Sequence, residues 1–377
     1  MTVYLDHNAT TPLLPEVLEA MLPFFRNEFG NASSRTHAWG WRAAAHVENA
    51  REAVAGLIGA DVSEIVFTSG ATEAINHALK GTFELSGATR PVIVTAATEH
   101  RAELDTCDRL KRSGAEVCIV PVLSDGIIDL DALRKAVSER TWMVAIMSAN
   151  NETGVVQPLR EISQIAHEKG ALFFSDTTQA PGRLLIDVND EGIDLCCLSA
   201  HKFHGPKGIG ALYIRRKNPR VSVAPLLDGG GQENGRRSGT LNVPGIVGMG
   251  RAATIARRDW WQDALKVSTL RTRLEKSILD LGKITVSGST RSRLPNTSNL
   301  CFHGHTATDL IRKMTDIAVS TGSACSTAED QPSHVLLAMG RSHADATSSI
   351  RFSLGKTTTN EEVDEAISVL RRALTNN

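Results

Sequence analysis

The stretch CLSAHKFHGPKGIGAL, residues 197–212, carries the residues that most directly indicate chemistry. An apolar run ends at Ser199, and His201 and Lys202 then lead into a turn rich in glycine and proline. A lysine amine at a strand end can form an aldimine with pyridoxal phosphate, while a neighbouring hydroxyl and imidazole hold the phosphate. Lysine in a loop is more often a solvated surface residue, so this stretch alone leaves both interpretations open.

The segment FTSGATEAINHAL, residues 67–79, offers a second group of candidates. A buried strand runs through Ser69 and Gly70 into a helix that begins near Ala71 and Thr72. The N-terminus of a helix that follows a turn of small residues can bind a phosphate through its N–H groups. The same pattern also fits an ordinary helix start with Ser69 or Thr72 as the cap.

Three more polar sites follow apolar runs. Asp176 in FFSDTTQAPG could keep a pyridine nitrogen protonated, or it could cap a helix. His100 in TAATEHRAEL could stack on a cofactor ring or move a proton, although a lone histidine is more often structural. Asn150 and Asn151 follow another strand in SANNETGVVQP. Because open α/β sheets bind ligands at the carboxyl ends of their strands, these sites together favour one binding cleft.

The cysteines divide into two kinds. Five lie in apolar or helical surroundings, namely Cys107, Cys118, Cys196, Cys197 and Cys301. Cys325 lies instead in the small, polar stretch STGSACSTAED, so it is either a tolerated surface cysteine or a nucleophile on a mobile arm. No C-x-x-C pair occurs, which argues against zinc ribbons and thioredoxin-like motifs. Scattered cysteines in a chain of 377 residues are typical of reduced thiols in a cytoplasmic protein.

Composition excludes several function classes. The formal net charge is −1 and no tract of like charge stands out, so we expect no direct binding of nucleic acid. The N-terminus lacks the basic and apolar regions of a secretion signal, and no run approaches the roughly 18 apolar residues of a membrane span. The motif HGH at residues 303–305 has no evident third ligand, so we predict an ordinary loop there and no metal site.

The elements that must position these residues form an α/β pattern. Short apolar runs alternate with amphipathic segments such as residues 159–170, where Gly170 is a plausible helix stop. The runs are continuous rather than alternating, which indicates strands covered on both faces of a mostly parallel sheet. These runs span residues 64–70, 91–97, 115–122, 142–149, 171–178, 193–200 and 208–216.

The pattern changes after about residue 255. A long helix over residues 255–282, with Trp260 and Trp261 expected to pack between two domains, leads into strand–helix–strand material and a final helix at 360–374. We therefore predict a large domain over residues 12–255 and a smaller α+β domain from residues 1–11 and 256–377. The Cys325 loop, at about residues 320–332, belongs to the smaller domain.

Ten motifs in series extend over residues 4–355: YLDHNATTP, FGNASSRTHAWGW, FTSGATEA, ATEH, NNETGVVQP, DTTQAPG, SAHKFHGPKGIGALY, GGGQENGRRSGTLN, STGSACST and SSIRFSLG. In these motifs the chain resembles the cysteine desulfurases of the NifS/IscS type, in the class V family of pyridoxal-phosphate-dependent aminotransferases. The resemblance implies fold-type I, with a large domain built on a mostly parallel sheet flanked by helices. It also implies pyridoxal 5′-phosphate as the cofactor and a homodimer.

The resemblance carries roles to matching positions. Lys202 resembles the aldimine lysine, His100 the ring-stacking histidine, and Cys325 the cysteine that forms a persulfide. Arg351, aided by Asn151, resembles the clamp on the substrate carboxylate, for which a guanidinium fork is well suited. The remaining matches concern the cofactor: Asp176 at the pyridine nitrogen, Gln179 and Asn151 at the hydroxyl side, Ala71, Thr72, Ser199 and His201 at the phosphate, and Thr240 lent to the phosphate by the partner subunit.

The implied reaction converts L-cysteine into L-alanine and leaves a persulfide on Cys325. A sulfur-acceptor protein would then take the sulfur toward iron–sulfur cluster assembly, tRNA thiolation or DNA phosphorothioation. Two positions depart from the family pattern, Ala32 for a usual proline and Asn234 for a residue that is often basic. Alternatives are a selenocysteine lyase, another class V transaminase, or a docking subunit that has kept only the fold. A plain transaminase would have no need of Cys325.

Overall fold

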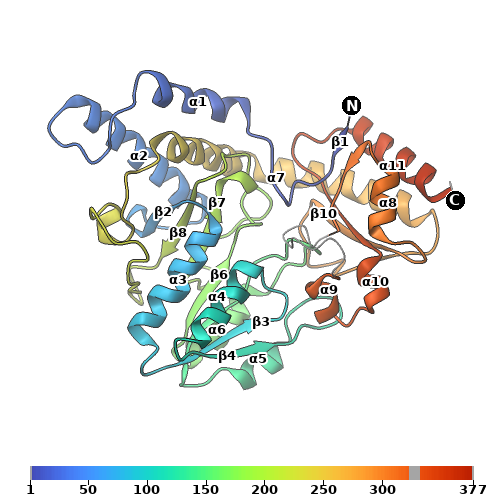
Figure 1. Ribbon diagram of the computed structural model, residues 1–377, viewed down its shortest axis with the longest axis horizontal. Coiled ribbons are helices and arrows are strands. Elements are labelled where there is room, and N and C mark those ends of the chain that lie inside the picture. Colours follow the sequence, from blue (N-terminus) through green and yellow to red (C-terminus); the bar gives the residue numbers. More distant parts are fainter. Residues whose placement is uncertain (1, 322–331, 376–377) are drawn as a thin grey trace.

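The structure is a computed structural model that describes residues 2–321 and 332–375 (Figure 1). Cys325 therefore lies outside the described residues. The helices are α1 (Pro15–Arg26), α2 (Ala38–Leu57), α3 (Ala71–Ser86), α4 (Arg101–Lys111), α5 (Leu130–Ala136), α6 (Leu159–Glu168), α7 (Val243–Leu279), α8 (Ala307–Lys313), α9 (His334–Ala338), α10 (His343–Thr347) and α11 (Asn360–Thr375). None of them is long and apolar enough to cross a membrane.

The larger sheet has the strand order β2-β8-β7-β6-β5-β3-β4. Its strands are β2 (Ile65–Thr68), β3 (Val92–Ala96), β4 (Glu116–Val120), β5 (Thr141–Ala145), β6 (Leu172–Asp176), β7 (Leu195–Ser199) and β8 (Gly210–Ile214). Strand β8 runs antiparallel to both of its neighbours, and the other paired strands are parallel. The predicted strands and the mostly parallel sheet are thereby confirmed.

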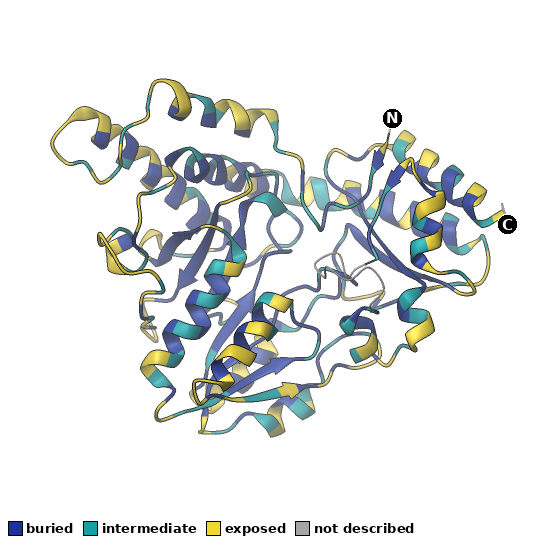
Figure 2. Cartoon of the chain, in the orientation of Figure 1, coloured by how far each residue is buried: buried dark blue, intermediate teal, exposed yellow. Residues whose placement is uncertain are grey.

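Both faces of this sheet are buried except at its edge strand β4, which is partly exposed, and this burial explains the continuous apolar runs of the other strands. Cys196 packs into the core beneath α2, α6 and α7, while the next residue, Cys197, packs into the opposite core beneath α3 and α4. Figure 2 shows the buried strands enclosed by helices whose outer faces are exposed. Successive side chains of a strand point to opposite faces. A strand that is buried on both faces therefore has apolar residues at successive positions instead of an alternation of apolar and polar ones.

A second core lies beside the first one. It contains a three-stranded antiparallel sheet, β12-β10-β9, and a parallel pair, β1-β11. These strands are β1 (Val3–Tyr4), β9 (Ile284–Val286), β10 (Thr297–Phe302), β11 (Ile317–Ala318) and β12 (Ser349–Ser353). Val3 and Leu5 belong to this core, so the N-terminal segment packs with C-terminal elements, but the domain boundaries themselves stay a prediction.

Helix α7 belongs to both cores, and it begins twelve residues before the predicted Ile255, at Val243. The sequence predicts a later start because Pro244 and several glycines have low helix propensity. Proline is tolerated in the first turn, and the glycines permit close packing: a Cβ on Gly250 would lie 2.6 Å from the Cα of Ala50 in α2. The expectation that Trp261 packs between domains is wrong, since it is 63% exposed.

A buried ion pair fastens the loop before α7 to the sheet. Glu233 accepts hydrogen bonds from both terminal nitrogens of Arg51 in α2, at 2.7 and 2.8 Å, and from the backbone N–H of Phe67 in β2, at 2.8 Å. The Arg51 guanidinium also lies 4.7 Å from the Phe67 ring centroid. This loop leads to Thr240, and β2 leads to the start of α3, so one contact positions two predicted parts of the site.

We expect Glu233→Ala to destabilise the fold by about 3–5 kcal/mol, because it leaves Arg51 buried without its charged partner. Glu48→Ala is the matched control, since Glu48 also pairs with Arg51 but is 57% exposed and should cost under about 1 kcal/mol. Urea unfolding followed by circular dichroism measures both. Equal losses in the two variants would contradict a special role for the buried pair.

Candidate active site

A cleft of about 560 Å³ opens at the carboxyl ends of the parallel strands. Its walls contain most of the predicted site residues: Ala71, Thr72, His100, Asn151, Asp176, Gln179, Ser199, His201, Lys202 and Arg351. These residues come from both cores, because Arg351 lies on β12 and the others lie on or between elements of the larger sheet. The structure thus brings together side chains that are up to 280 positions apart in the sequence, from Ala71 to Arg351.

Lys202 lies in the short 3-10 turn Ala200–Lys202 that follows β7. Its Nζ donates hydrogen bonds to the backbone carbonyls of Asn8, at 2.6 Å, and Ala9, at 2.9 Å. The amine is therefore aimed by backbone groups of a segment nearly two hundred residues away. The sequence analysis does not predict this role of Asn8, although Asn8 lies in the motif YLDHNATTP, because nothing in a single sequence indicates which carbonyl faces the lysine.

The N-terminus of α3 forms one end of the cleft. Gly70 precedes it, and no side chain of the described residues caps the helix. The N–H groups of Ala71 and Thr72 therefore lie where an anion can accept from them. Gly210 of β8 permits this approach, since a Cβ there would lie 2.7 Å from the Cα of Gly70. A phosphate fits this end of the cleft, with the Ser199 hydroxyl beside it.

His201 lies at the same end of the cleft. Its Nδ1 is 3.1 Å from the hydroxyl oxygen of Thr10. Burial, together with the positive charges of Lys202 and Lys207, lowers the pKa of His201 to about 4. At neutral pH the ring is therefore uncharged and offers one N–H donor. Lys207, which also lines the cleft, was not among the sequence candidates.

The opposite end is built around Asp176, at the end of β6. Its Oδ1 accepts from the backbone N–H of Thr178, at 2.9 Å, and from the thiol of Cys197, at 3.2 Å. Burial and the nearby Asp176 charge raise the pKa of Cys197 well above its usual value, which keeps this thiol a donor. A carboxylate fixed in this way fits a pyridinium N–H.

Behind this end lie two carboxyl groups that sequence reasoning missed. Glu99 and Glu103 are fully buried, and burial raises the pKa of both, that of Glu103 to about 8. Met147 N–H donates to Glu99, and the Thr95 hydroxyl donates to Glu103. Burial therefore favours the neutral form of both carboxyl groups, which limits the negative charge behind Asp176.

Arg351 is almost fully buried, with 2% of its side chain exposed. Its Nη2 pairs with Asp6 at 2.6 Å and its Nη1 donates to the backbone carbonyl of Asn151 at 3.0 Å. Its Nε–H has no hydrogen-bond partner within residues 2–321 and 332–375. A buried, incompletely satisfied guanidinium in a cleft wall fits a carboxylate ligand.

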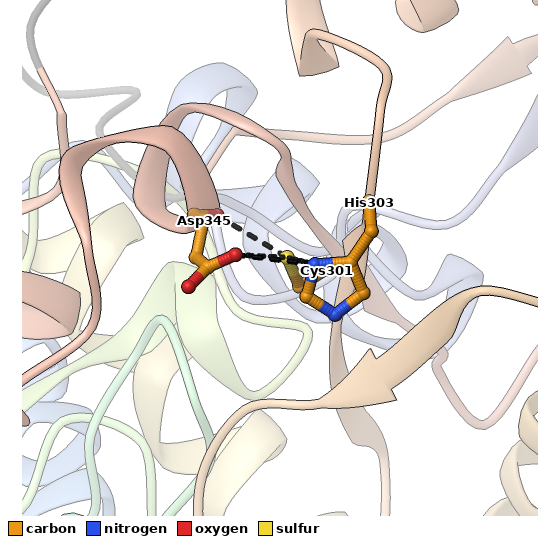
Figure 3. A group of neighbouring side chains, drawn as sticks. All are labelled: Cys301, His303 and Asp345. Carbon is orange, nitrogen blue, oxygen red and sulfur yellow. Dashed lines mark hydrogen bonds and ion pairs between the residues drawn. The ribbon is translucent and has the colours of Figure 1, made fainter.

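Two further predictions concern residues beyond this cleft. Thr240 is exposed and does not line it, so its proposed role toward a partner subunit stays a prediction. The absence of a metal site at HGH stays a prediction, and the structure adds that His303 lies beside Cys301 and Asp345, whereas His305 is not part of this group (Figure 3). Asp345 is 42 residues from His303, and only the fold brings it there.

A smaller cavity lies behind Lys202 and contains His7, His204 and Arg183. The two imidazole rings lie 6.4 Å apart between centroids. Burial lowers the pKa of His7 to about 4, with His204 adding to the effect, and burial likewise lowers that of His204 to about 4. Both rings are therefore neutral in the folded protein at neutral pH.

Comparisons with known proteins agree with this geometry. A family model described as Aminotransferase class-V matches residues 3–366. A relative from Anaeromyxobacter sp. (strain Fw109-5), named Cysteine desulfurase IscS, is 51% identical over 97% of this chain and 90% of its own. A solved structure described as a NifS-like protein is 40% identical with a TM-score of 0.93 and covers 100% of both chains. Another, "SspA in complex with cysteine", is 35% identical with a TM-score of 0.83 over 95% of this chain and 100% of its own.

We expect the free energy of unfolding to fall as the pH drops from about 6.5 to about 4. His7 and His204 take up protons near pH 6.5 when unfolded but stay neutral in the fold down to about pH 4. Within that window each contributes at most about 1.4 kcal/mol per pH unit, and above it neither contributes. Urea unfolding between pH 4.5 and 7.5 measures the slope.

His7→Gln should reduce this slope, whereas His343→Gln, an exposed histidine at the start of α10, should leave it unchanged. A slope that is the same in wild type and His7→Gln would contradict a buried, neutral His7.

Proposed function

The chain belongs to the aminotransferase class-V family, and we propose that within it the protein acts as a cysteine desulfurase. It converts L-cysteine into L-alanine and leaves the sulfur as a persulfide on Cys325. The observation that carries this proposal is the single cleft in which Lys202, Asp176 and the uncapped start of α3 face Arg351. The activity named for the relatives, and the cysteine bound to one of them, support cysteine as the substrate.

Pyridoxal 5′-phosphate is the cofactor that this cleft fits. The start of α3 with Ser199 and His201 would hold the phosphate, Asp176 the pyridine nitrogen, and Gln179 with Asn151 the hydroxyl side. When bound, the cofactor supplies an electron sink for the electron pair left at the substrate's α-carbon. Lys202 is the residue that would hold it covalently.

Arg351 would bind the substrate carboxylate. A guanidinium fork binds two carboxylate oxygens, and the Nε–H, which has no hydrogen-bond partner among the described residues, can donate to one of them. Asp6 and the Asn151 carbonyl fix the plane of the guanidinium, so the substrate meets a preformed site. This anchoring sets which α-carbon bond faces Lys202.

Proton movements fall to Lys202 and His100. The Lys202 amine would take the α-proton of the substrate once it no longer holds the cofactor. His100 lines the cleft with its Nδ1 accepting from the Ala102 N–H, which holds the ring in one orientation. The other ring nitrogen can then exchange a proton with the substrate sulfur.

Sulfur transfer falls to Cys325. Its thiolate attacks the sulfur of the bound cysteine, an S–S bond forms and the C–S bond breaks. The electron pair of the broken bond stays with the substrate's β-carbon, which takes up a proton and becomes the methyl group of alanine. The substrate carbon is reduced as the sulfur is oxidised to the persulfide level, so no external oxidant is needed.

The setting of this reaction is also proposed. We infer a homodimer in which Thr240 completes the partner's phosphate site, since Thr240 is exposed and outside its own cleft. Unpaired cysteines among the described residues support a cytoplasmic protein. The acceptor is a protein that takes sulfur from Cys325, for iron–sulfur clusters, tRNA thiolation or DNA phosphorothioation.

Incubating the purified protein with L-cysteine should yield alanine together with protein-bound persulfide. Lys202→Ala should lose turnover, and Cys325→Ser should lose the persulfide. Cys118→Ser is the matched control, because Cys118 is partly exposed on β4 and should keep both products. If Cys325→Ser keeps full desulfurase activity without added thiol, the sulfur-transfer step is wrong, and a selenocysteine lyase or transaminase becomes the better assignment.

Arg351→Lys should raise KM for cysteine by roughly 10–100-fold, because one ammonium replaces a fork of charged hydrogen bonds. The absorption spectrum of the bound cofactor should stay unchanged, since Arg351 faces the substrate. Steady-state kinetics over a range of cysteine concentrations measures the effect. A KM within twofold of wild type would remove Arg351 from the substrate site.

A further inference from the structure

Cys301, His303 and Asp345 form a compact cluster that the proposed reaction does not use (Figure 3). Cys301 lies near the end of β10, His303 follows that strand, and Asp345 lies in the first turn of α10. Their ligand atoms all lie within 4.8 Å of one another. We propose that these three residues form a zinc site, separate from the cofactor cleft and independent of the proposed function.

The spacing of the three ligand atoms matches a tetrahedral zinc ion. With bonds of about 2.3 Å to sulfur and about 2.0–2.1 Å to nitrogen and oxygen, tetrahedral angles separate sulfur from the other ligands by about 3.6 Å and nitrogen from oxygen by about 3.3 Å. In the structure, the Cys301 Sγ is 3.7 Å from both the His303 Nδ1 and the Asp345 Oδ1, which lie 3.1 Å from each other. Small shifts of these three side chains would bring their ligand atoms to the separations expected around a zinc ion.

The surrounding hydrogen bonds orient these ligands. The outer nitrogen of His303, Nε2, lies 3.0 Å from the Thr285 hydroxyl, so a proton on Nε2 leaves the lone pair of Nδ1 for a metal. The second carboxylate oxygen of Asp345 accepts from the Ser342 hydroxyl at 2.8 Å, which leaves Oδ1 facing Cys301. Supporting contacts of this kind are typical of zinc sites.

Exposure permits an ion to enter. Cys301 is buried, whereas the side chains of His303 and Asp345 are 41% and 33% exposed. A water molecule can therefore complete four ligands from the open side. A set of one thiolate, one imidazole and one carboxylate favours zinc over magnesium or calcium, which prefer oxygen ligands alone. Binding releases the thiol proton to solvent.

The site also has a defined place in the fold. Cys301 pairs with Ser349 across the β10-β12 ladder, and Asn299 pairs with Arg351 two residues further along. A bound ion would connect β10 to α10, the helix that leads directly into β12. The metal would therefore fasten the strand that carries Arg351 without touching the cleft.

The test uses the full-length holoenzyme in a Cys325→Ser background, so that Cys325 contributes no zinc-binding thiol. After loading with zinc and dialysis, elemental analysis should find one zinc per chain. Cobalt loading should produce a thiolate-to-cobalt charge-transfer band in the difference spectrum. Chelator competition should show that Cys301→Ser and His303→Gln weaken binding about 100-fold or more, and that Thr285→Val weakens it about 10-fold.

His305→Gln is the matched control, because it removes the other histidine of HGH and should leave zinc binding unchanged. Asp345→Asn, at a partly exposed position, provides a second ligand variant if Cys301→Ser fails to fold. The proposal is overturned if the parent protein binds no zinc at micromolar concentration. It is equally overturned if the Cys301→Ser/His303→Gln double variant retains one zinc per chain.

Discussion

The arrangement of the cleft depends on one buried asparagine, Asn8, which is 1% exposed. Its carbonyl accepts from the Lys202 amine, and its side-chain amide donates to the Asn151 carbonyl at 3.0 Å. On the other side it contacts the second core. Its partners there are Thr297 Oγ1, Ser353 Oγ and Asn296 Nδ2, at 2.9 to 3.0 Å, while Gln179 Nε2, which follows β6 of the larger sheet, donates to the Asn8 carbonyl at 3.1 Å. Because the polar groups of Asn8 form hydrogen bonds to both cores, this residue fixes the position of one core relative to the other.

This junction explains how a substrate site can form between two separately packed cores. Lys202 is positioned from the larger sheet and Arg351 from β12, and both contact the segment that contains Asp6 and Asn8. That segment is held in place because Val3 and Leu5, just before it, are buried in the second core. Loss of apolar contacts far from the cleft would therefore shift Lys202 and Arg351 relative to each other. The substrate would then be less well oriented for reaction.

Local sequence patterns predicted the strands and the cleft, whereas features that depend on long-range contacts were missed. Continuous apolar runs predicted the strands, and the rule for parallel sheets placed His100 and Asp176 at one cleft. The direction of β8 was not predicted, because an apolar run carries no direction. Neither the role of Asn8 nor the Glu99–Glu103 pair could be read from the chain, since burial depends on elements that pack over them. Arg351 was assigned only through a family resemblance, and the resemblance also decided between the two interpretations of Lys202.

Burial also separates the thiols by chemistry. Burial raises the pKa of Cys196 to about 12 and that of Cys197 well above its usual value, and it likewise raises the pKa of Cys107. A thiol that keeps its proton is a poor nucleophile, so these three are suited to packing and hydrogen bonding rather than to sulfur transfer. The buried cysteines therefore do not compete with the nucleophilic cysteine for the substrate sulfur. A nucleophilic cysteine is better suited to a segment whose neighbouring residues are small and polar, and the sequence around Cys325 has that composition.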